Sequence, residues 1–329
     1  MMEGIRISKR PRLKDPYLIC AWPGMGDVAF KAASYLVEKL KAEEFAEIAP
    51  QNFFYLTGSV IKEGMLDIPE LPQNKFYFWK NSATKRGGKS EGNDLIIFLS
   101  NAQPDLAQAE EYCQKINFVA KSFKVKTVIG FAAMPQPIDH TQAPNVWYSP
   151  TSKEIKEELK NYNLMLISDG QISGMNGLYL GIAKREGLQG FCLLGEVPLY
   201  TIQIENPKAS YAVLEALIRI LDIHIELSGL LEQAHNMENE INKLLDYLKV
   251  GTPLGPIGEE EIEKIKKSLS QLTKLPGSVK EKIENLFKEA KSDIAKAQEL
   301  KIELDKWNIY KDYEDKFLDL FKKAKDKNN

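Results

Sequence analysis

The stretch Leu164-Met-Leu-Ile-Ser-Asp-Gly-Gln-Ile-Ser-Gly-Met-Asn-Gly-Leu-Tyr-Leu-Gly-Ile-Ala-Lys184 joins an apolar run, a glycine-rich turn and a helical pattern. Gly170, Gly174 and Gly177 fall within this turn, and glycine is favoured where the backbone takes a positive φ or approaches another group closely. The helix that follows would direct its unpaired N–H groups into the same space. This order predicts a strand that enters a helix through a tight turn, as in α/β folds.

A second turn of the same kind lies near the N-terminus. Tyr17 to Trp22 is a short apolar run, Pro23-Gly-Met-Gly-Asp27 is the turn, and Val28 to Leu40 has helical spacing. Two glycine turns after two strands predict a rim of the sheet where backbone groups converge. They do not by themselves predict a reaction.

Apolar runs and helical patterns alternate along the first 250 residues. The expected strands are 17–22, 53–60, 75–79, 94–99, 127–132, 146–148, 164–168, 191–194 and 201–204. The expected helices are 28–40, 107–123, 153–162, 177–186, 207–221 and 225–248. Because such alternation builds a sheet covered on both faces, we expect a three-layer α/β/α core with a mostly parallel sheet. Continuous apolar runs indicate central strands at 95–99, 127–132, 164–168 and 191–194.

The composition changes after Gly251-Thr-Pro-Leu-Gly-Pro256, which is typical of a linker. Beyond it there is no arginine and no strand-like run, and helices are expected at about 258–274, 279–306 and 310–325. We therefore expect an α/β domain over 1–250 and a charged helical appendage over 251–329. The apolar stripe of helix 225–248 would pack on the chain's own core or tail, or form a coiled coil with another subunit.

Charge and cysteine usage narrow the class of protein. The chain of 329 residues has a net charge of −2 and only six arginines, which argues against a nucleic-acid partner. Cys20, Cys113 and Cys192 lie far apart in apolar runs and indicate buried, reduced thiols. Without a Cys/His cluster, an apolar leader or a run of about 18 apolar residues, we expect no metal, no cofactor and no membrane contact. These features predict a soluble, cytoplasmic protein.

Two motifs resemble nucleotide-binding loops. Gly24-Met-Gly-Asp-Val-Ala29 fits the dinucleotide fingerprint, but Trp22-Pro23 separates the strand from the glycines, and no clear acidic partner follows. Gly88-Lys-Ser90 resembles the end of a phosphate-binding loop, but Ala83 stands where its first glycine is required and a strand follows it. We therefore favour simple turns over cofactor sites.

Candidate catalytic side chains are few. Ser173, His140 and Asp169 would suit nucleophilic catalysis, but a helix-capping serine and a loop-bracing histidine are the favoured interpretation. Glu196, after the run 191–194, is the best single carboxylate at the rim, and its alternative role is to accept hydrogen bonds from neighbouring turn amides.

Six segments then occur in a characteristic order: Ala21-Trp-Pro-Gly-Met-Gly26, Ile68-Pro-Glu-Leu-Pro72, Gln103-Pro104, Gln171-Ile-Ser-Gly-Met-Asn-Gly-Leu178, Gly190-Phe-Cys-Leu-Leu-Gly-Glu196 and Glu205-Asn-Pro-Lys-Ala209. In order and spacing they resemble the proteasome assembly chaperone 2 family, in its archaeal and bacterial branch, over about residues 10–248.

The resemblance implies an α/β/α core similar in fold to nucleoside phosphorylases, which usually assembles into homo-oligomers. Eukaryotic members form a heterodimeric chaperone for the proteasome α-ring, and some archaeal relatives bind proteasomes through C-terminal tails. Such tails end in a hydrophobic residue, tyrosine and any residue, whereas this sequence ends in Asp326-Lys-Asn-Asn329. We therefore do not expect direct docking of that end into α-ring pockets.

The turns at 23–27, 103–104, 135–140, 169–177 and 195–198 should share one rim. The candidate ligand- or partner-binding residues on it are Trp22, Pro23, Gly24, Met25, Gly26, Asp27, Gln103, Pro104, His140, Asp169, Gly170, Gln171, Ser173, Gly174, Asn176, Gly177, Gly195 and Glu196.

Two hypotheses for the function follow from these observations. The first is a non-catalytic, oligomeric, chaperone-like module that binds itself and proteasome subunits or other proteins. The alternative is a small-molecule-binding protein or an enzyme, of hydrolase or phosphorylase type, that uses the same rim. An enzyme needs at least two ionisable groups in one pocket, and the sequence spreads Asp27, His140, Asp169 and Glu196 over four loops.

Overall fold

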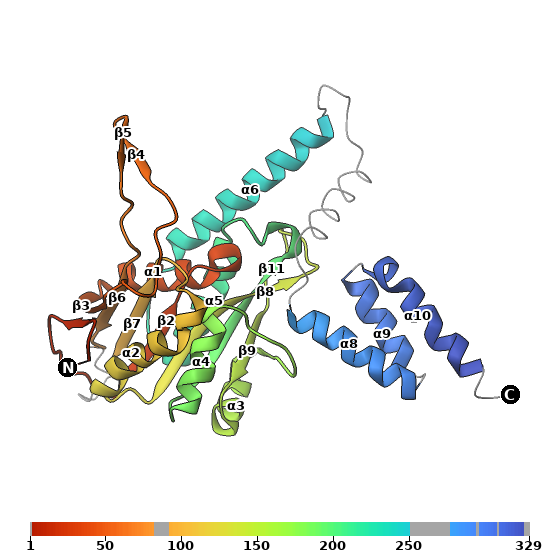
Figure 1. The fold of residues 1–329 in the computed structure, drawn as a ribbon, viewed down its shortest axis with the longest axis horizontal. Helices are drawn as coiled ribbons and strands as arrows, with labels where there is room; N and C mark the ends of the chain where they lie inside the picture. Colours follow the sequence, from red (N-terminus) through yellow and green to blue (C-terminus); the bar gives the residue numbers. More distant parts are fainter. Residues whose placement is uncertain (1, 82–91, 251–276, 294–295, 308, 326–329) are drawn as a thin grey trace.

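A nine-stranded mixed sheet forms the centre of the α/β part (Figure 1). The computed structural model describes residues 2–81, 92–250, 277–293, 296–307 and 309–325. The strand order is β1-β3-β6-β7-β2-β8-β11-β9-β10. The strands are β1 (Ile5–Ile7), β2 (Tyr17–Ala21), β3 (Glu43–Ile48), β6 (Asn74–Trp79), β7 (Leu95–Ser100), β8 (Thr127–Gln136), β9 (Val146–Pro150), β10 (Met165–Leu166) and β11 (Gln189–Pro198).

Parallel pairing joins the four central strands and the edge pair of β9 and β10. The strands β7, β2, β8 and β11 run in parallel, whereas β6, β3 and β1 on one side and β9 on the other pair antiparallel to their inner neighbours. The expected α/β fold is confirmed, and the sheet is mixed. The carboxyl ends of the four central strands therefore lie at one edge, where such sheets bind ligands.

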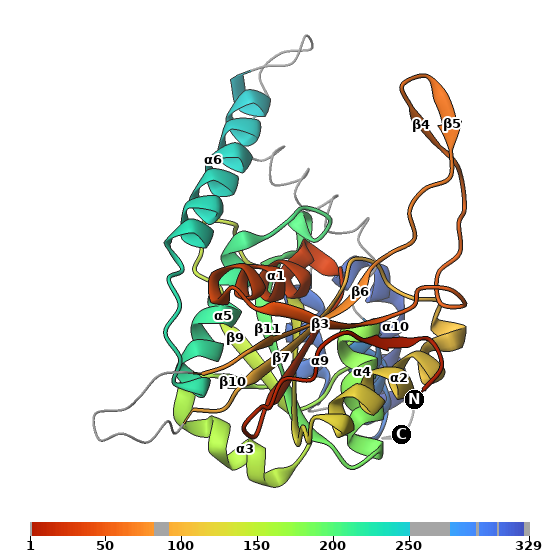
Figure 2. The same ribbon diagram turned by 90° about the vertical axis from the view of Figure 1, so that its left-hand side faces the viewer.

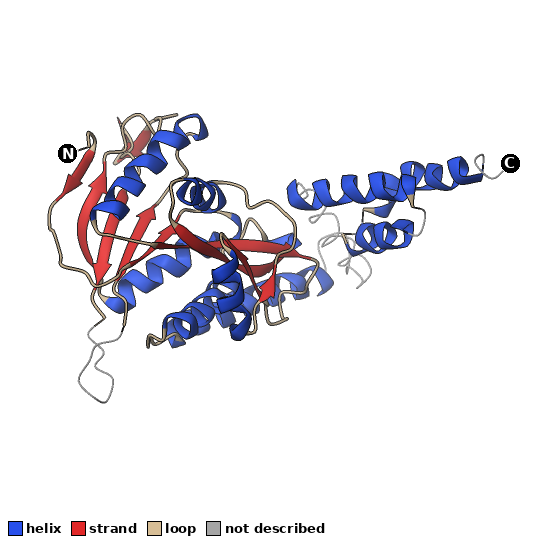
Figure 3. Cartoon of the chain, turned by 90° about the horizontal axis from the view of Figure 1, so that it is seen from below, coloured by secondary structure: helices blue, strands red, loops and turns tan. Residues whose placement is uncertain are grey.

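Helices cover both faces of the sheet, as Figures 2 and 3 show. On one face lie α2 (Ala109–Ser122) and α4 (Met175–Arg185), and on the other lie α1 (Val28–Leu40), α3 (Lys153–Leu159) and α5 (Pro207–Leu221). Short 3-10 turns, η1 (Met25–Asp27), η2 (Leu106–Gln108), η3 (Lys160–Tyr162) and η4 (Leu199–Thr201), adjoin them. Each face encloses its own apolar cluster, so the three-layer arrangement is confirmed.

Two predicted strands are wrong. Residues 53–59 form an irregular loop, in which Phe53 and Phe54 are buried in the core whereas Tyr55 and Leu56 are exposed. This segment leads into a separate hairpin of β4 (Val60–Lys62) and β5 (Met65–Asp67). Residues 201–204 form the end of η4 and a turn, closed by a hydrogen bond from the Ile204 N–H to the Thr201 carbonyl.

The expected central strand at 164–168 is also wrong. Only Met165 and Leu166 pair, and β10 lies at the edge of the sheet beside β9. Ile167, which follows β10, lies in a loop and packs against the apolar cluster under α2 and α4. The edge strand β1 and its neighbour β3 escaped prediction because their charged residues lie among apolar ones and resemble surface structure.

Two predicted turns at the rim belong to strands. Residues 135–136 continue β8 and residues 195–198 continue β11, since the two strands pair along their full length, from Gln189 beside Thr127 to Pro198 beside Gln136. The pairing carries both strands beyond the predicted ends of their apolar runs.

The long helix α6 (Ser228–Val250) packs on α5 near its start, where Leu230 and Ala234 are buried. Farther along, Leu244 is 58% exposed, so the apolar stripe is only partly covered by the described chain. The predicted helix 279–306 is two helices, α8 (Gly277–Ser292) and α9 (Lys296–Lys306), followed by α10 (Tyr310–Lys325). These three share their own apolar cluster.

Four sequence predictions fall outside the described residues: the linker at 251–256, the helix at 258–274, the loop around Gly88-Lys-Ser90 and the end of the sequence at 326–329. Among the helices of the described ranges, none is long and apolar enough to cross a membrane.

Candidate functional site

The two glycine turns lie side by side at the carboxyl edge of the central strands. Asn176, in the first turn of α4, is buried and forms two hydrogen bonds with the end of β2. Its Oδ1 accepts from the Trp22 N–H at 3.0 Å, and its Nδ2 donates to the Trp22 carbonyl at 3.0 Å. One side chain thus joins segments 154 residues apart in the sequence. The prediction that turns 23–27 and 169–177 share a rim is confirmed.

Gln103, after β7, makes a second bridge between the same turns. Its Nε2 donates to the Pro23 carbonyl at 2.6 Å, and its Oε1 accepts from the Met175 N–H at 3.0 Å. The amide therefore satisfies one of the N–H groups that a helix leaves unpaired at its start.

The glycines of the second turn are required by its geometry. Gly174 has φ of 73°, a conformation that other residues rarely adopt. A Cβ at Gly177 would lie 2.2 Å from the Ile172 carbonyl oxygen, so the turn folds directly against its own helix. Gly26 also has a positive φ, of 59°. The expectation that at least one of these glycines is conformationally required is confirmed.

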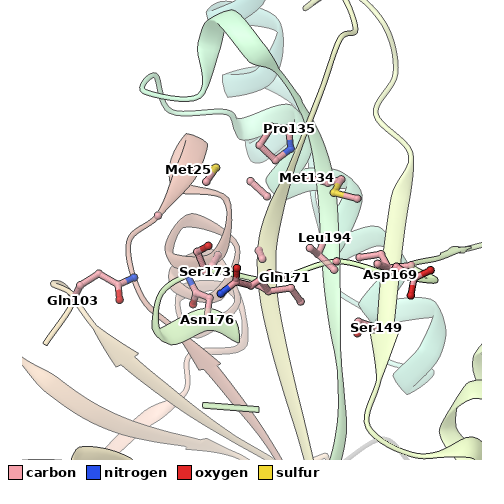
Figure 4. A pocket seen from close by; sticks show the side chains of 17 residues that line it. Met25, Gln103, Met134, Pro135, Ser149, Asp169, Gln171, Ser173, Asn176 and Leu194 are labelled. Carbon is pink, nitrogen blue, oxygen red and sulfur yellow. The ribbon is translucent and has the colours of Figure 1, made fainter. Parts of the chain in front are cut away.

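A pocket of about 120 Å³ opens between these turns and the ends of β8 and β11 (Figure 4). Eight residues predicted from the sequence line it: Gly24, Met25, Gln103, Asp169, Gly170, Gln171, Ser173 and Asn176. Nine others complete the wall: Ala29, Ala132, Ala133, Met134, Pro135, Ser149, Ile167, Ile172 and Leu194. The prediction of a shared rim therefore located about half of the lining.

Most of the missed residues belong to sheet strands rather than loops. Ala133, Met134 and Pro135 lie on the part of β8 that runs past its predicted end at 132. Ser149 comes from β9, and Ile167 from the loop that crosses the sheet after β10. The signal available in the sequence was the unbroken run Ala132-Ala-Met-Pro135, which continues the strand without a polar residue.

The pocket is apolar at its walls and polar at its mouth. Leu194 and Ala132 are buried, whereas Asp169, Gln171 and Ser173 are exposed. Asp169 is the one ionisable side chain among the described residues that line it. Such a cavity can hold a small apolar group and hydrogen-bond its polar edge, but it does not pair an acid with a base.

The turn after β2 uses its backbone within the protein. The Gly26 N–H donates to the Ile202 carbonyl at 2.8 Å, and the Gly26 carbonyl accepts from the Asn206 N–H at 2.7 Å. A phosphate-binding loop needs free N–H groups, and the Asp27 carboxylate beside them would repel an anion. The dinucleotide-like motif therefore works here as a packed turn.

Asp27 lies in the left-handed region at the start of α1. Partial burial raises its pKa to about 6, and the nearby Glu205 carboxylate contributes to the rise, whereas Lys31 opposes it. Lys31 forms an ion pair with Glu205. Neither Asp27 nor Gly26 lines the pocket.

His140 does not join Ser173 and Asp169 in the pocket. Its Nδ1 lies 2.8 Å from the Tyr200 hydroxyl and its Nε2 lies 2.8 Å from Asn242 Oδ1, on α6. Asp139 also contacts the same imidazole, at 3.2 Å. His140 therefore braces a loop against α6, and the catalytic trio considered from the sequence is not assembled.

Glu196 serves neighbouring amides, the alternative role considered for it. It is buried in β11, and its carboxylate accepts from the Asn145 N–H and Nδ2 at 2.9 Å and from Trp147 Nε1 at 2.8 Å. Glu196 is not among the residues that line the pocket. Glu196 thus holds the loop before β9 against β11.

Three other predicted rim residues, Trp22, Pro104 and Gly195, do not line the pocket but pack in the structure around it. Trp22 packs against Phe98, Tyr112 and Tyr179 in the core. Pro104 is buried before η2, and a Cβ at Gly195 would lie 2.8 Å from the Ala209 carbonyl oxygen on α5. In the described ranges, no group of three or more His, Cys, Asp or Glu residues could hold a metal ion.

The sequence profile of the PAC2 family matches residues 18–245, which include the whole rim. The chain belongs to the PAC2 family. An uncharacterised protein of Methanocaldococcus jannaschii is 30% identical over 246 residues, which cover 71% of this chain and 85% of the relative. The PAC2 match includes all four central strands and the six segments on which the family resemblance was based.

Solved structures share the PAC2 fold. Pyrococcus furiosus PbaB, an archaeal proteasome activator, is 30% identical, with a TM-score of 0.62 over 73% of this chain and 97% of PbaB. Pyrococcus furiosus PbaA, an archaeal homolog of proteasome-assembly chaperone, is 24% identical, with a TM-score of 0.55 over 73% of this chain and 96% of PbaA, and shows the common fold.

Proposed function

We propose that this chain is a non-catalytic, chaperone-like module that self-associates through its α/β part and binds a protein partner at the rim pocket. Proteasome subunits are the proposed partner, because the similar PbaB is an archaeal proteasome activator. The rim residues that line the pocket would make the contact.

The composition of the pocket carries this proposal. Its walls combine two methionines, Met25 and Met134, with alanine, leucine and isoleucine side chains. Methionine is flexible and polarisable, so it adapts to the shape of an inserted side chain. A volume of about 120 Å³ suits one apolar side chain of a partner rather than a whole cofactor.

Filling the pocket tests the partner contact. The Ala133→Phe substitution places a ring into the cavity from β8, and we expect at least a tenfold loss of affinity for purified proteasome core particles of the same organism, measured by biolayer interferometry. Ser122→Phe, at the exposed end of α2, adds the same ring outside the pocket and should leave the affinity unchanged. Equal binding by both variants and the unmodified chain would contradict the proposed role of the pocket.

The enzyme alternative rests on the position of the pocket at the carboxyl ends of parallel strands. It is tested by assaying the purified chain with nucleosides plus inorganic phosphate and with simple esters. We expect no turnover above the uncatalysed rate. Turnover that Asp169→Asn abolishes would replace the binding module with an enzyme that uses the same pocket.

A further inference from the structure

The hairpin formed by β4 and β5 stands away from the body of the protein in both Figures 1 and 2. We call residues 55–72 the arm. Its two strands form a sheet of their own, with no third strand among the described residues. A two-stranded hairpin is at best marginally stable in water unless a face of it is covered.

One face of the arm carries three exposed apolar side chains. The register pairs Ile61 with Leu66, and Ile68 lies two residues farther on the same face, because side chains alternate along a strand. These three side chains are 73%, 76% and 70% exposed. The opposite face is mixed, since Lys62 pairs with Met65 and Val60 with Asp67. A single apolar face on a protruding hairpin marks a contact surface.

An unfilled apolar groove lies at the base of the arm. It has a volume of about 600 Å³. Its apolar side is formed by Phe54, Tyr55, Leu56 and Leu71, and its polar side is formed by Gln51, Asn52, Gln108 and Glu111. Tyr55 is 64% exposed and Leu56 is 48% exposed. The arm leads away from this groove, so its apolar tip does not fill the groove of its own chain.

We infer that the arm packs into the groove at the base of the arm of a second copy of this chain, in a reciprocal two-fold contact. This inference rests on the self-association in the proposed function and names its surface. A two-fold axis makes the tip of each arm meet the base of the other, so one strip of surface supplies both halves of the contact.

The available area matches what such a contact needs. At on the order of 100 Å² exposed for each large apolar side chain, the five residues of the tip and the base offer about 500 Å² per copy. Complete burial of these side chains in two copies would remove about 1,000 Å² from solvent in total, which is the least area expected of a specific interface. The five side chains are Tyr55, Leu56, Ile61, Leu66 and Ile68.

Paired substitutions on the two faces of the hairpin test the inference. Ile61→Lys with Leu66→Glu removes the apolar face, while the opposite charges across the strands keep the hairpin paired. The matched control, Lys62→Glu with Met65→Lys, makes the same kind of pair on the other face. Sedimentation at about 10 μM should show at least a tenfold weaker association for the first variant. The control should associate as strongly as the unmodified chain.

Disulfide trapping between differently tagged copies gives a second measurement. One copy carries Leu66→Cys on the arm and the other carries Gln108→Cys beside the groove, and the native cysteines are buried. Oxidation should link the two tags. Absence of this link, or an unchanged association constant for the apolar-face variant, overturns the arm contact and leaves the proposed self-association standing. A monomeric unmodified chain overturns both, whereas partner binding is judged separately by Ala133→Phe.

Discussion

At the scale of single residues, we expect alanine substitutions at two glycines of α4 to change the free energy of unfolding in opposite directions. A Cβ at Gly177 would meet the Ile172 carbonyl oxygen at 2.2 Å, and backbone cannot move aside cheaply. We expect Gly177→Ala to lower the free energy of unfolding by about 2 kcal/mol or more, through strain in the turn. Gly181, four residues on, faces open space, so Gly181→Ala should raise stability by about 0.5–1 kcal/mol through helix propensity.

Denaturant unfolding of both variants checks this pair of predictions. Because the two changes add the same methyl group to the same helix, Gly181→Ala controls for helix propensity alone. If Gly177→Ala were as stable as Gly181→Ala, the close packing of the turn would not be needed for the fold.

Asp27 gives a prediction about pH. Its pKa in the folded protein is about 6, above the value of 3.8 expected of an exposed aspartate, so the folded state holds the proton more tightly. Stability therefore falls as the pH rises from about 4 to about 6. Asp27→Asn removes this loss and keeps a residue that tolerates the left-handed region.

We expect Asp27→Asn to be more stable than the unmodified chain by about 1 kcal/mol at pH 7, a value reduced for the partial exposure of the carboxylate. At pH 4 the two proteins should have nearly equal stability. Urea unfolding at a series of pH values measures the difference, and a constant difference from pH 4 to pH 7 would contradict the assignment.

At the scale of elements, the sequence predicted the buried structure better than the edges. Helices at 28–40, 207–221 and 310–325 agree with the structure because their apolar residues recur at helical spacing, and Asn206 caps the second of them. Strands 53–60 and 164–168 were wrong because their apolar residues are anchors on turns and loops. A short apolar run does not by itself identify a strand, because apolar side chains on a loop can also pack into the core.

Some residues of the site could be predicted from the sequence, and others could not. Glycine turns and their amide partners, Asn176 and Gln103, could be predicted because the glycine pattern and the positions after strands are local signals. The wall formed by β8 and β9 was missed. The apolar run to Pro135 is a local signal for a longer β8, but the position of β9 depends on its pairing with β11. His140 and Glu196 show the same limit, because their partners Asn242 and Trp147 are distant in sequence.

At the scale of the whole molecule, we propose that the chain divides near residue 250. The two clusters of the α/β part use residues up to Leu230, and the third cluster is formed by α8, α9 and α10. Leu199 is the one residue of the described α/β part in the third cluster. A chain that ends at residue 250 should therefore keep a folded sheet.

We expect this truncation to lower the stability of the α/β part by about 1–2 kcal/mol, since it uncovers the single side chain of Leu199. Leu199→Ala in the full chain should have a similar cost. Urea unfolding followed by tryptophan fluorescence compares the two. A truncated chain that does not unfold cooperatively would show that the helices are required by the sheet.

The bridge between Asn176 and Trp22 also has a consequence for the chemical lifetime of the protein. Asn176 is followed by Gly177, the pair most prone to deamidation in flexible chains, where the glycine nitrogen attacks the side-chain carbonyl. In the fold that nitrogen donates to the Gly174 carbonyl and the amide is held at both ends. Unfolding releases both restraints, and the aspartate that forms cannot donate to the Trp22 carbonyl. Time spent unfolded therefore turns into permanent damage, and because deamidation is slow relative to refolding, the rate of damage follows the fraction of molecules that are unfolded.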